Sequence, residues 1–386
     1  MHPLAGPARS RALCPFLLAA LVVAGEGCIA PGATPAPPNH PAPAAASTAP
    51  APAAGGAPVA AAIAREPSGL PVGPGSGVPR PAGTPGNLKV LDWAGFKAAV
   101  SWTFDDAQPS HIAHYAELQA VGVPMTFYVT TNNAGEPGFA ETWQRAVRDG
   151  HEIGNHSVHH CHANLAGCTS GRPLGTLDAE IDDATQYIVA HTGQSAVWTA
   201  ASPFGDGGYD DPARSRFFVN RGVPSGTIAA YGDTDPYNLP VHPLVTGETA
   251  DRMNQVTDAA RAGGRWVIFL VHTLTPTGAV WYAPVATTDV TGAMSHGKAL
   301  ADVWTGTLVD VAAYWMGQKI VGGATPAVAG ATTTWSWALP AHFPPGKFVR
   351  VRVDGGTPSQ NGKPLPWSEH GYYEVALDAG SLTLSP

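Results

Sequence analysis

Apolar runs alternate with amphipathic segments through the middle of the chain, from about residue 88 to residue 325. The run AAVSWTF predicts a buried strand, and HIAHYAELQAVG after it predicts a helix that Gly122 ends. VPMTFYVT, AVWTAASPFG, GTIAAY and RWVIFLVHT predict further strands, whereas ETWQRAVRDG, TLDAEIDDATQYIVAHTG, TADRMNQVTDAARAGG and TLVDVAAYWMGQKI predict helices. Strands that are apolar along their length and alternate with helices predict an α/β fold, a parallel sheet or barrel with helices outside it.

The pattern changes after Ile320, where no further helix is predicted. TTTWSWALP, KFVRVRVDGG and GYYEVALDAGSLTLSP alternate apolar and polar residues between glycines and prolines. This predicts a small β module over residues 326–386. Its three tryptophans, Trp335, Trp337 and Trp367, would form either a carbohydrate platform or the core of the module, and we favour the core.

Residues 1–28 have the pattern of an export signal. Arg9 and Arg11 precede an apolar run from Ala12 to Ala24, which is too short to span a bilayer comfortably. Cys28 follows AGEG, a loose match to a bacterial lipoprotein cleavage site. We therefore expect an extracytoplasmic protein, attached to the cell envelope by a lipid on Cys28 or secreted after an ordinary signal is cleaved.

Composition defines the next segment and limits the partners. Residues 29–87 are mostly Ala, Pro, Gly, Ser and Thr, which cannot bury a core, so they predict a disordered linker that proline stiffens. The formal net charge is -8 and the chain has no run of Lys or Arg, so we expect no nucleic-acid partner. The predicted domain between linker and β module covers residues 88–325.

Two cysteines remain outside the signal segment, Cys161 and Cys168. In an exported protein this pair predicts a disulfide that closes a short loop. A role as metal ligands is the alternative, which we disfavour because the spacing is not that of a common zinc site.

Polar clusters follow three of the predicted strands, at the ends where parallel α/β folds collect their function. Asp105 and Asp106 close SWTFDD, His156 and His160 lie in GNHSVHH, and His272 closes VIFLVH. The two histidines are four residues apart, so a compact loop can aim both rings at one point. With a carboxylate they form a metal site that leaves positions open for water and substrate, as catalysis requires. Zinc suits this set, and cobalt, nickel or iron would also fit.

The two adjacent aspartates suggest a division of roles. On a regular strand they would face opposite ways, but at a strand end the chain turns and both can reach one site. One would bind the metal while the other accepts a proton from the attacking water. His272, from a distant strand, would protonate the leaving group. Its alternative role is that of a capped histidine at a strand end.

TFDD, HSVHH and LVHT resemble the motifs of NodB-type polysaccharide deacetylases, also called carbohydrate esterase family 4, over residues 95 to 320. The resemblance implies a distorted (β/α) barrel, a divalent metal that is usually zinc, and removal of acetyl groups from N-acetylglucosamine polymers, peptidoglycan or acetylated xylan. The implied roles are as follows: Asp105 is the catalytic base, His272 the catalytic acid, Asp106, His156 and His160 the metal ligands, Phe204 the oxyanion residue through its backbone N–H, and Ser157 a substrate-side residue whose hydroxyl stabilises the loop.

The sequence departs from this family at two motifs. In TAASPFGDGG, Pro203, Phe204 and Gly205 match the third motif, but Ala201 stands where the family has the arginine that orients the base. Arg265 or another group would have to replace that arginine. The fourth motif, an aspartate that tunes the acid histidine, has only Asp233 and Asp235 as candidates.

Some residues near these motifs keep two interpretations. His159 would hydrogen-bond within its loop or line the cleft. Trp281 and Tyr282 would stack on a sugar ring or pack under their own loop.

The sequence thus predicts a metal-dependent carbohydrate deacetylase. The alternatives are an O-acetyl esterase or small-amide hydrolase of the same fold, which the altered third motif suggests, and a glycan-binding envelope protein that has lost turnover.

Overall fold

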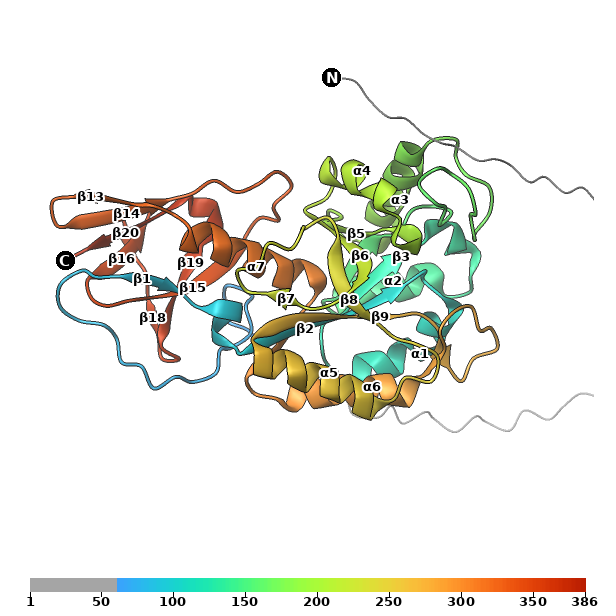
Figure 1. Ribbon diagram of the computed structural model, residues 1–386, viewed down its shortest axis with the longest axis horizontal. Helices are drawn as coiled ribbons and strands as arrows, with labels where there is room; N and C mark the ends of the chain where they lie inside the picture. The colour runs from blue at the N-terminus through green and yellow to red at the C-terminus, as the bar shows by residue number, and fades with distance from the viewer. Residues whose placement is uncertain (1–60) are drawn as a thin grey trace, which may run out of the picture. The chain divides into compact units, whose positions relative to one another are not determined.

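The computed structural model describes residues 61–386 (Figure 1). The predicted signal at residues 1–28, the lipid site at Cys28 and the first part of the predicted linker lie outside the described residues. Within the described part, no helix is both long and apolar enough to cross a membrane.

A closed barrel of parallel strands forms the centre of the fold. Its strands, in the order in which they lie side by side, are β2 (Ala98–Asp105), β3 (Thr126–Val129), β4 (Glu152–Asn155), β5 (Thr199–Ala201), β6 (Val219–Ser225), β8 (Leu239–Pro243) and β9 (Arg265–Val271). β9 also pairs in parallel with β2, which closes the barrel. Outside the ring, β12 (Val303–Thr305) pairs with β2 and β7 (Ile228–Ala229) pairs with β9. The predicted α/β barrel is confirmed.

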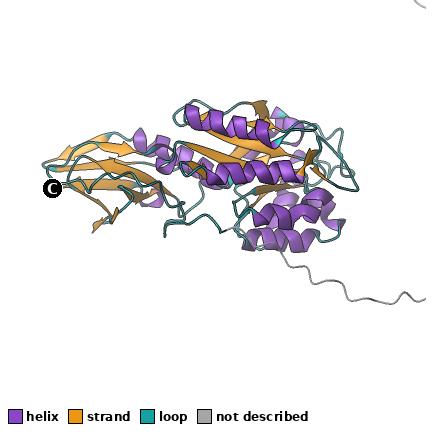
Figure 2. Ribbon diagram, turned by 90° about the horizontal axis from the view of Figure 1, so that it is seen from below, coloured by secondary structure: helices purple, strands orange, loops and turns teal. Residues whose placement is uncertain are grey.

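Helices cover the outside of the barrel (Figures 1 and 2). They are α1 (Pro109–Ala120), α2 (Phe139–Arg148), α3 (Leu177–Thr192), α4 (Asp210–Arg214), α5 (Ala250–Gly263), α6 (Thr287–Ala299) and α7 (Leu308–Gly322). Thr176, Thr249 and Thr307 cap three of them, because each hydroxyl accepts a hydrogen bond from the exposed amides of the first turn. Gly193 and Gly264 end α3 and α5 in the left-handed conformation that favours glycine.

The C-terminal module consists of two antiparallel sheets. One contains β1 (Leu88–Val90), β15 (Phe348–Val353), β19 (Tyr372–Ala376) and β18 (Trp367–Ser368), and the other contains β13 (Pro326–Ala329), β14 (Thr332–Ser336), β20 (Ser381–Ser385), β16 (Thr357–Gln360) and β17 (Lys363–Pro364). Helix α7 packs against the sheet that contains β1 and β15. Trp335 is buried in a core that also holds Trp315 of α7, and Trp337 and Trp367 pack against that core. The three tryptophans therefore belong to the module's core.

The structure divides two segments differently from the predicted domain boundaries. Strand β1, at the start of the predicted barrel domain, pairs with β15 of the module. Part of the predicted linker packs on the same module: Leu70 is buried, Pro71 accepts a hydrogen bond from Arg350, and Glu66 accepts one from Tyr372. The sequence-based boundaries missed these contacts because composition does not reveal pairing between distant segments.

Candidate metal-centred active site

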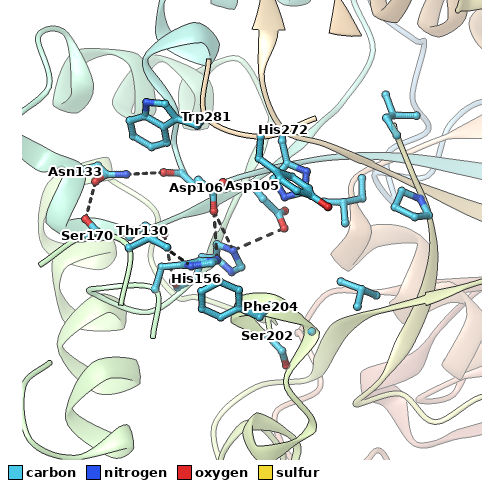
Figure 3. A pocket seen from close by; sticks show the side chains of 18 of the residues that line it. Asp105, Asp106, Thr130, Asn133, His156, Ser170, Ser202, Phe204, His272 and Trp281 are labelled. Atoms are coloured by element: carbon cyan, nitrogen blue, oxygen red, sulfur yellow. Dashed lines mark hydrogen bonds and ion pairs between the residues drawn. The ribbon is translucent and has the colours of Figure 1, made fainter. Parts of the chain in front are cut away.

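A cavity of about 880 Å³ opens at the carboxyl ends of the barrel strands, where the sequence motifs meet (Figure 3). It is lined by Asp105, Asp106, Thr130, Asn133, His156, His160, Thr169, Ser170, Ser202, Phe204, Gly205, Val223, Pro243, Leu244, Val245, Leu270, His272, Trp281 and Tyr282. The structure therefore brings together the predicted catalytic residues, the predicted metal ligands and Phe204. Ser157 is buried and does not line the cavity, so the structure does not place it beside the substrate. Its hydroxyl accepts a hydrogen bond from the backbone N–H of His160 and so stabilises the loop.

Asp106, His156 and His160 form a compact set of possible metal ligands, with one donor atom from each within 4.8 Å of the others. Nε2 of His156 lies 3.4 Å and Nε2 of His160 lies 3.5 Å from Oδ1 of Asp106. Nδ1 of His156 lies 2.8 Å from the carbonyl of Ala201, which can only accept, so Nδ1 carries a proton and Nε2 is the ring nitrogen directed at Asp106. Two imidazole nitrogens and a carboxylate facing one point fit a divalent metal ion.

The backbone around this set explains how the side chains converge. Asp106, His160 and Phe204 have φ values of 77°, 49° and 58°, in the left-handed region that non-glycine residues seldom adopt. The turn at Asp106 lets both adjacent aspartates face the cavity, as predicted. Such strained residues cluster at functional sites because the surrounding structure holds them there.

The electrostatics of the set favour a cation. Burial opposes the charged form of Asp106, but its hydrogen bond with His156 and the nearby imidazoles outweigh burial and hold the pKa of its carboxyl well below the usual range. Burial also opposes the charge of His156, yet Asp105 and Asp106 raise the pKa of that ring. Burial, assisted by the charge of His156, lowers the pKa of His160 to about 4, so this ring is neutral at neutral pH, as a ligand must be.

Asp105 is held by an arginine that the sequence analysis did not identify. Arg221, fully buried on β6, donates from Nη2 to Oδ2 of Asp105 and from Nη1 to the carbonyl of Gly222, 2.9 Å away. Oδ1 of Asp105 is buried without a partner among the described residues and is left to bind a proton. Arg221 pairs directly with Ala201 in the register of β5 and β6, so the missing arginine is supplied by the neighbouring strand.

Arg265, the replacement named from sequence, is exposed at the start of β9, at the other end of that strand from His272. The signal for Arg221 was present in FFVNRGV, where a lone arginine interrupts an apolar strand. The guanidinium of Arg221 lies 5.2 Å from the centre of the Tyr128 ring. The other neighbour of this ring is Gly154, where an added Cβ would lie 2.4 Å from a ring atom, so the position of the ring requires glycine there.

His272 lies across the cavity from the ligand set (Figure 3). The backbone carbonyl of His272 accepts a hydrogen bond from Nε2 of His111 at 2.6 Å. The centres of the His272 and Tyr282 rings are 4.8 Å apart. Burial lowers the pKa of His272, although Asp105 and Asp106 act in the opposite direction. Asp233 and Asp235 do not line the cavity, and Asp235 instead pairs with Arg214 at 2.7 Å. The proposal that either tunes His272 was therefore wrong.

A chain of hydrogen bonds connects Asp106 to the loop that carries Trp281 and Tyr282. Nε2 of Gln108 donates to Oδ2 of Asp106 at 3.0 Å, and the hydroxyl of Thr273 donates to Oε1 of Gln108 at 2.7 Å. The same hydroxyl accepts from the backbone N–H groups of Trp281 and Tyr282, each at 3.1 Å. Both aromatic rings line the cavity and stay 43% and 64% exposed, so they are not packed under their loop.

Cys161 and Cys168 form the predicted disulfide directly after His160. Thr169, the next residue, places its hydroxyl 3.2 Å from Nδ1 of His160 and so supports the ligand from behind. His159 points away from the cavity: its Nδ1 is 3.0 Å from Oε1 of the buried Glu180. His159 therefore does not line the cleft, and its side-chain partner lies on α3 instead of within its own loop.

Comparison with known proteins gives one family match. Residues 95–216 match the family model described as "Polysaccharide deacetylase". This range contains the carboxylates, the histidine loop and Phe204, but neither Arg221 nor His272.

Several solved structures are similar in outline. A putative polysaccharide deacetylase from Mycobacterium smegmatis is 16% identical, with 62% of this chain and 96% of that chain covered and a TM-score of 0.43. A family 4 carbohydrate esterase from Streptomyces lividans in complex with acetate is 17% identical (55% and 94% covered, TM-score 0.37). A family 4 acetyl xylan esterase from Clostridium thermocellum in complex with a cobalt ion is 18% identical (55% and 89% covered, TM-score 0.35). These likenesses are too distant to carry a substrate or metal to this chain.

Proposed function

Because residues 95–216 place this chain in the polysaccharide deacetylase family, we propose that it is a metal-dependent enzyme that removes acetyl groups from an N-acetylglucosamine-type polymer or peptidoglycan. The observation that carries the proposal is the convergence of a paired carboxylate, a three-residue ligand set and a buried histidine on one cavity. Each performs a different task in hydrolysis, and the barrel brings all three to the same cavity from different strands.

Asp106, His156 and His160 are the residues that would hold the metal, most suitably zinc, with cobalt, nickel or iron as alternatives. When bound, the ion supplies a Lewis acid for the acyl carbonyl and lowers the pKa of a water molecule. Asp105, oriented by Arg221, accepts the proton of the attacking water on Oδ1. His272 gives a proton to the departing amine, and the backbone N–H of Phe204 hydrogen-bonds the developing oxyanion.

The buried Arg221 weakens the case for a different hydrolase. That alternative arose from Ala201, which leaves the third motif without its arginine. Since Arg221 reaches Asp105 from the adjacent strand, the base keeps a cationic partner and the chemistry need not differ.

We also propose an extracytoplasmic location, at the envelope through a lipid on Cys28 or in the medium. The signal-like pattern of residues 1–28 and the disulfide Cys161–Cys168 support it, because disulfides persist in oxidising compartments.

A substrate panel tests the choice of bond. Acetate release would be measured from N-acetylglucosamine oligomers, peptidoglycan and O-acetylated xylan with zinc-supplemented protein. Of these three substrates, we expect one of the two that carry N-acetyl groups to give the highest kcat/KM. Release from xylan alone would replace the proposal with an O-acetyl esterase, and glycan binding without any release would leave a binding protein.

A further inference from the structure

The cavity has two halves of different chemistry. Following the barrel order, β2, β3 and β4 contribute the carboxylates and the histidine loop, whereas β6, β8 and β9 occupy the opposite arc. On that arc the cavity is lined by Val223, Pro243, Leu244, Val245 and Leu270. Aliphatic side chains on three neighbouring strands thus form a continuous apolar wall beside His272.

This wall runs from the floor of the cavity to its rim. Leu244 and Leu270 are only 3% and 2% exposed, while Val223 and Val245 are 38% and 58% exposed. No Lys or Arg lines the cavity in the part of the chain that the structure describes, and its only carboxylates belong to the catalytic pair. Exposed aliphatic side chains that continue a buried apolar floor mark a surface that an apolar ligand group covers.

The opposite side suits a sugar. Asn133 and Ser170 lie beyond Asp106, and Trp281 lies over the same side (Figure 3). Amide and hydroxyl groups can hydrogen-bond sugar hydroxyls, and an indole can pack on the apolar face of a pyranose ring. The ligand set and Asp105 lie between this side and the apolar wall.

We propose that the apolar wall is an acyl subsite, and that the enzyme cleaves N-acyl glycans whose acyl group is longer than acetyl. This inference rests on the proposed function. The bond that breaks joins an acyl carbon to a sugar nitrogen, so one half of the cavity must take each side of that bond. An acetyl methyl would cover only a small part of five aliphatic residues, whereas a longer acyl chain would cover more of the wall between its buried floor at Leu270 and its exposed rim at Val245.

The overall reaction is ordinary amide hydrolysis. Water adds its oxygen to the acyl carbon, the carbon–nitrogen bond breaks, and the amine leaves with a proton. The products are a short-chain carboxylate and a glycan amine, and no oxidant or reductant is needed.

The test is a series of glucosamine oligomers carrying N-acetyl, N-propionyl or N-butyryl groups, with kcat/KM measured on the full zinc-supplemented chain. Transfer of a methylene from water to an apolar site predicts a gain of roughly four-fold per added carbon. We therefore expect the butyryl substrate to exceed the acetyl substrate. A butyryl rate below the acetyl rate overturns the acyl subsite and leaves the deacetylase proposal standing. No release from any member of the series overturns both.

Substitutions at Val245 test whether the apolar wall causes the preference for the longer acyl group. Val245→Phe fills the rim and Val245→Thr makes it polar at nearly constant size, so both should lower the ratio of butyryl to acetyl kcat/KM, the first at least ten-fold. Val328→Phe is the matched control, because Val328 is 72% exposed on β13, in the C-terminal module. An unchanged ratio in both Val245 variants would place the acyl chain elsewhere and contradict the proposal.

Discussion

Arg221 and Asp105 form a buried ion pair at the base of the cavity, and each depends on the other. Arg221 is fully buried and Asp105 is 3% exposed. Removing one member of such a pair leaves the other charge buried and uncompensated, which costs about 3–5 kcal/mol. The pair therefore has two functions: it fixes the direction of the carboxylate and it keeps two charges tolerable inside the barrel.

Replacing the arginine should affect both functions. Arg221→Met is expected to lower kcat by roughly 100-fold, with a smaller change in KM, because the base loses its orientation while the sugar contacts remain. It should also lower the free energy of unfolding by about 3–5 kcal/mol. Arg221→Lys should recover part of kcat, since it keeps the charge.

Steady-state kinetics and urea unfolding measure these effects, with Arg265→Met as the exposed control. A normal kcat in Arg221→Met would show that Asp105 needs no arginine. An equal loss in Arg265→Met would show that the effect is not specific to this ion pair.

His151 should make stability depend on pH. Its Nδ1 accepts from the N–H of Met125 at 3.1 Å and its Nε2 donates to Gln119 at 2.6 Å, so the native ring is neutral. Burial lowers its pKa to about 4, against the influence of Asp149. The unfolded chain therefore binds a proton at His151 more readily than the native protein does. The contribution of the neutral His151 ring to the free energy of unfolding is complete above pH 6.5 and is lost as the pH falls toward 4.

The measurement is the free energy of unfolding between pH 7 and pH 4. In His151→Gln the slope should be shallower than in the wild type by up to about 1.4 kcal/mol per pH unit. Parallel profiles of the two proteins would mean that His151 titrates normally in the native state.

At the scale of elements, the hydroxyl of Thr273 helps to position the loop after β9, together with backbone hydrogen bonds from Thr273 to Tyr282 and from Val285 to Thr273. Thr273 is fully buried and holds the backbone of Trp281 and Tyr282 while it also contacts Gln108. The loop therefore shares one hydrogen-bonded framework with Asp106. Loss of that hydroxyl should disturb the placement of both aromatic rings.

Thr273→Val removes the hydroxyl at constant shape and should raise KM for an oligosaccharide about five- to ten-fold, as expected for a lost hydrogen bond of about 1 kcal/mol or slightly more. Thr273→Ser keeps the hydroxyl and should restore most of the affinity. Equal KM values for Val and Ser variants would show that the side chain acts through packing alone.

Replacing a glycine by alanine should have opposite effects on stability at Gly317 of α7 and at Gly297 of α6. A Cβ at Gly317 of α7 would lie 2.6 Å from Leu377 and 3.0 Å from Val349, both fully buried in the C-terminal module. A Cβ at Gly297 of α6 would meet nothing closer than 3.9 Å. Gly317→Ala should therefore destabilise the protein by about 1–3 kcal/mol, whereas Gly297→Ala should stabilise it by about 0.5–1 kcal/mol.

Thermal or urea unfolding of both variants measures the difference. If Gly317→Ala were as stable as Gly297→Ala, α7 would not pack against the module as closely as the structure indicates.

Much of the barrel was predictable because its strands and helices have strong local patterns. The strand AAVSWTF, the helices that end at Gly122 and Gly193, and the ligand loop all appear in the structure as the sequence predicts. Arg221 stands out in FFVNRGV, but its contact with Asp105 could not be predicted, because that contact follows from the register of β6 against β5. The pairing of β1 with β15 was missed for the same reason.

At the scale of the whole described chain, α7 joins the barrel to the C-terminal module. It is buried on most of its surface, and its Trp315 packs in the same core as Trp266 of β9 and Val349 of β15. The module therefore extends the hydrophobic core of the barrel, and its tryptophans lie in that core or pack against it. The cavity remains the one place where the predicted motifs converge.

The most direct test of the account is acetate release from N-acetylglucosamine oligomers by the full chain, stripped with chelator and then supplied with zinc. Asp105→Asn and His156→Ala would be measured beside the wild type. The account predicts no release from stripped protein, recovery of the wild type with zinc, and no recovery of either variant. Release that survives the chelator, or that persists in both variants, would contradict a metal-centred mechanism at Asp105, Asp106, His156 and His160.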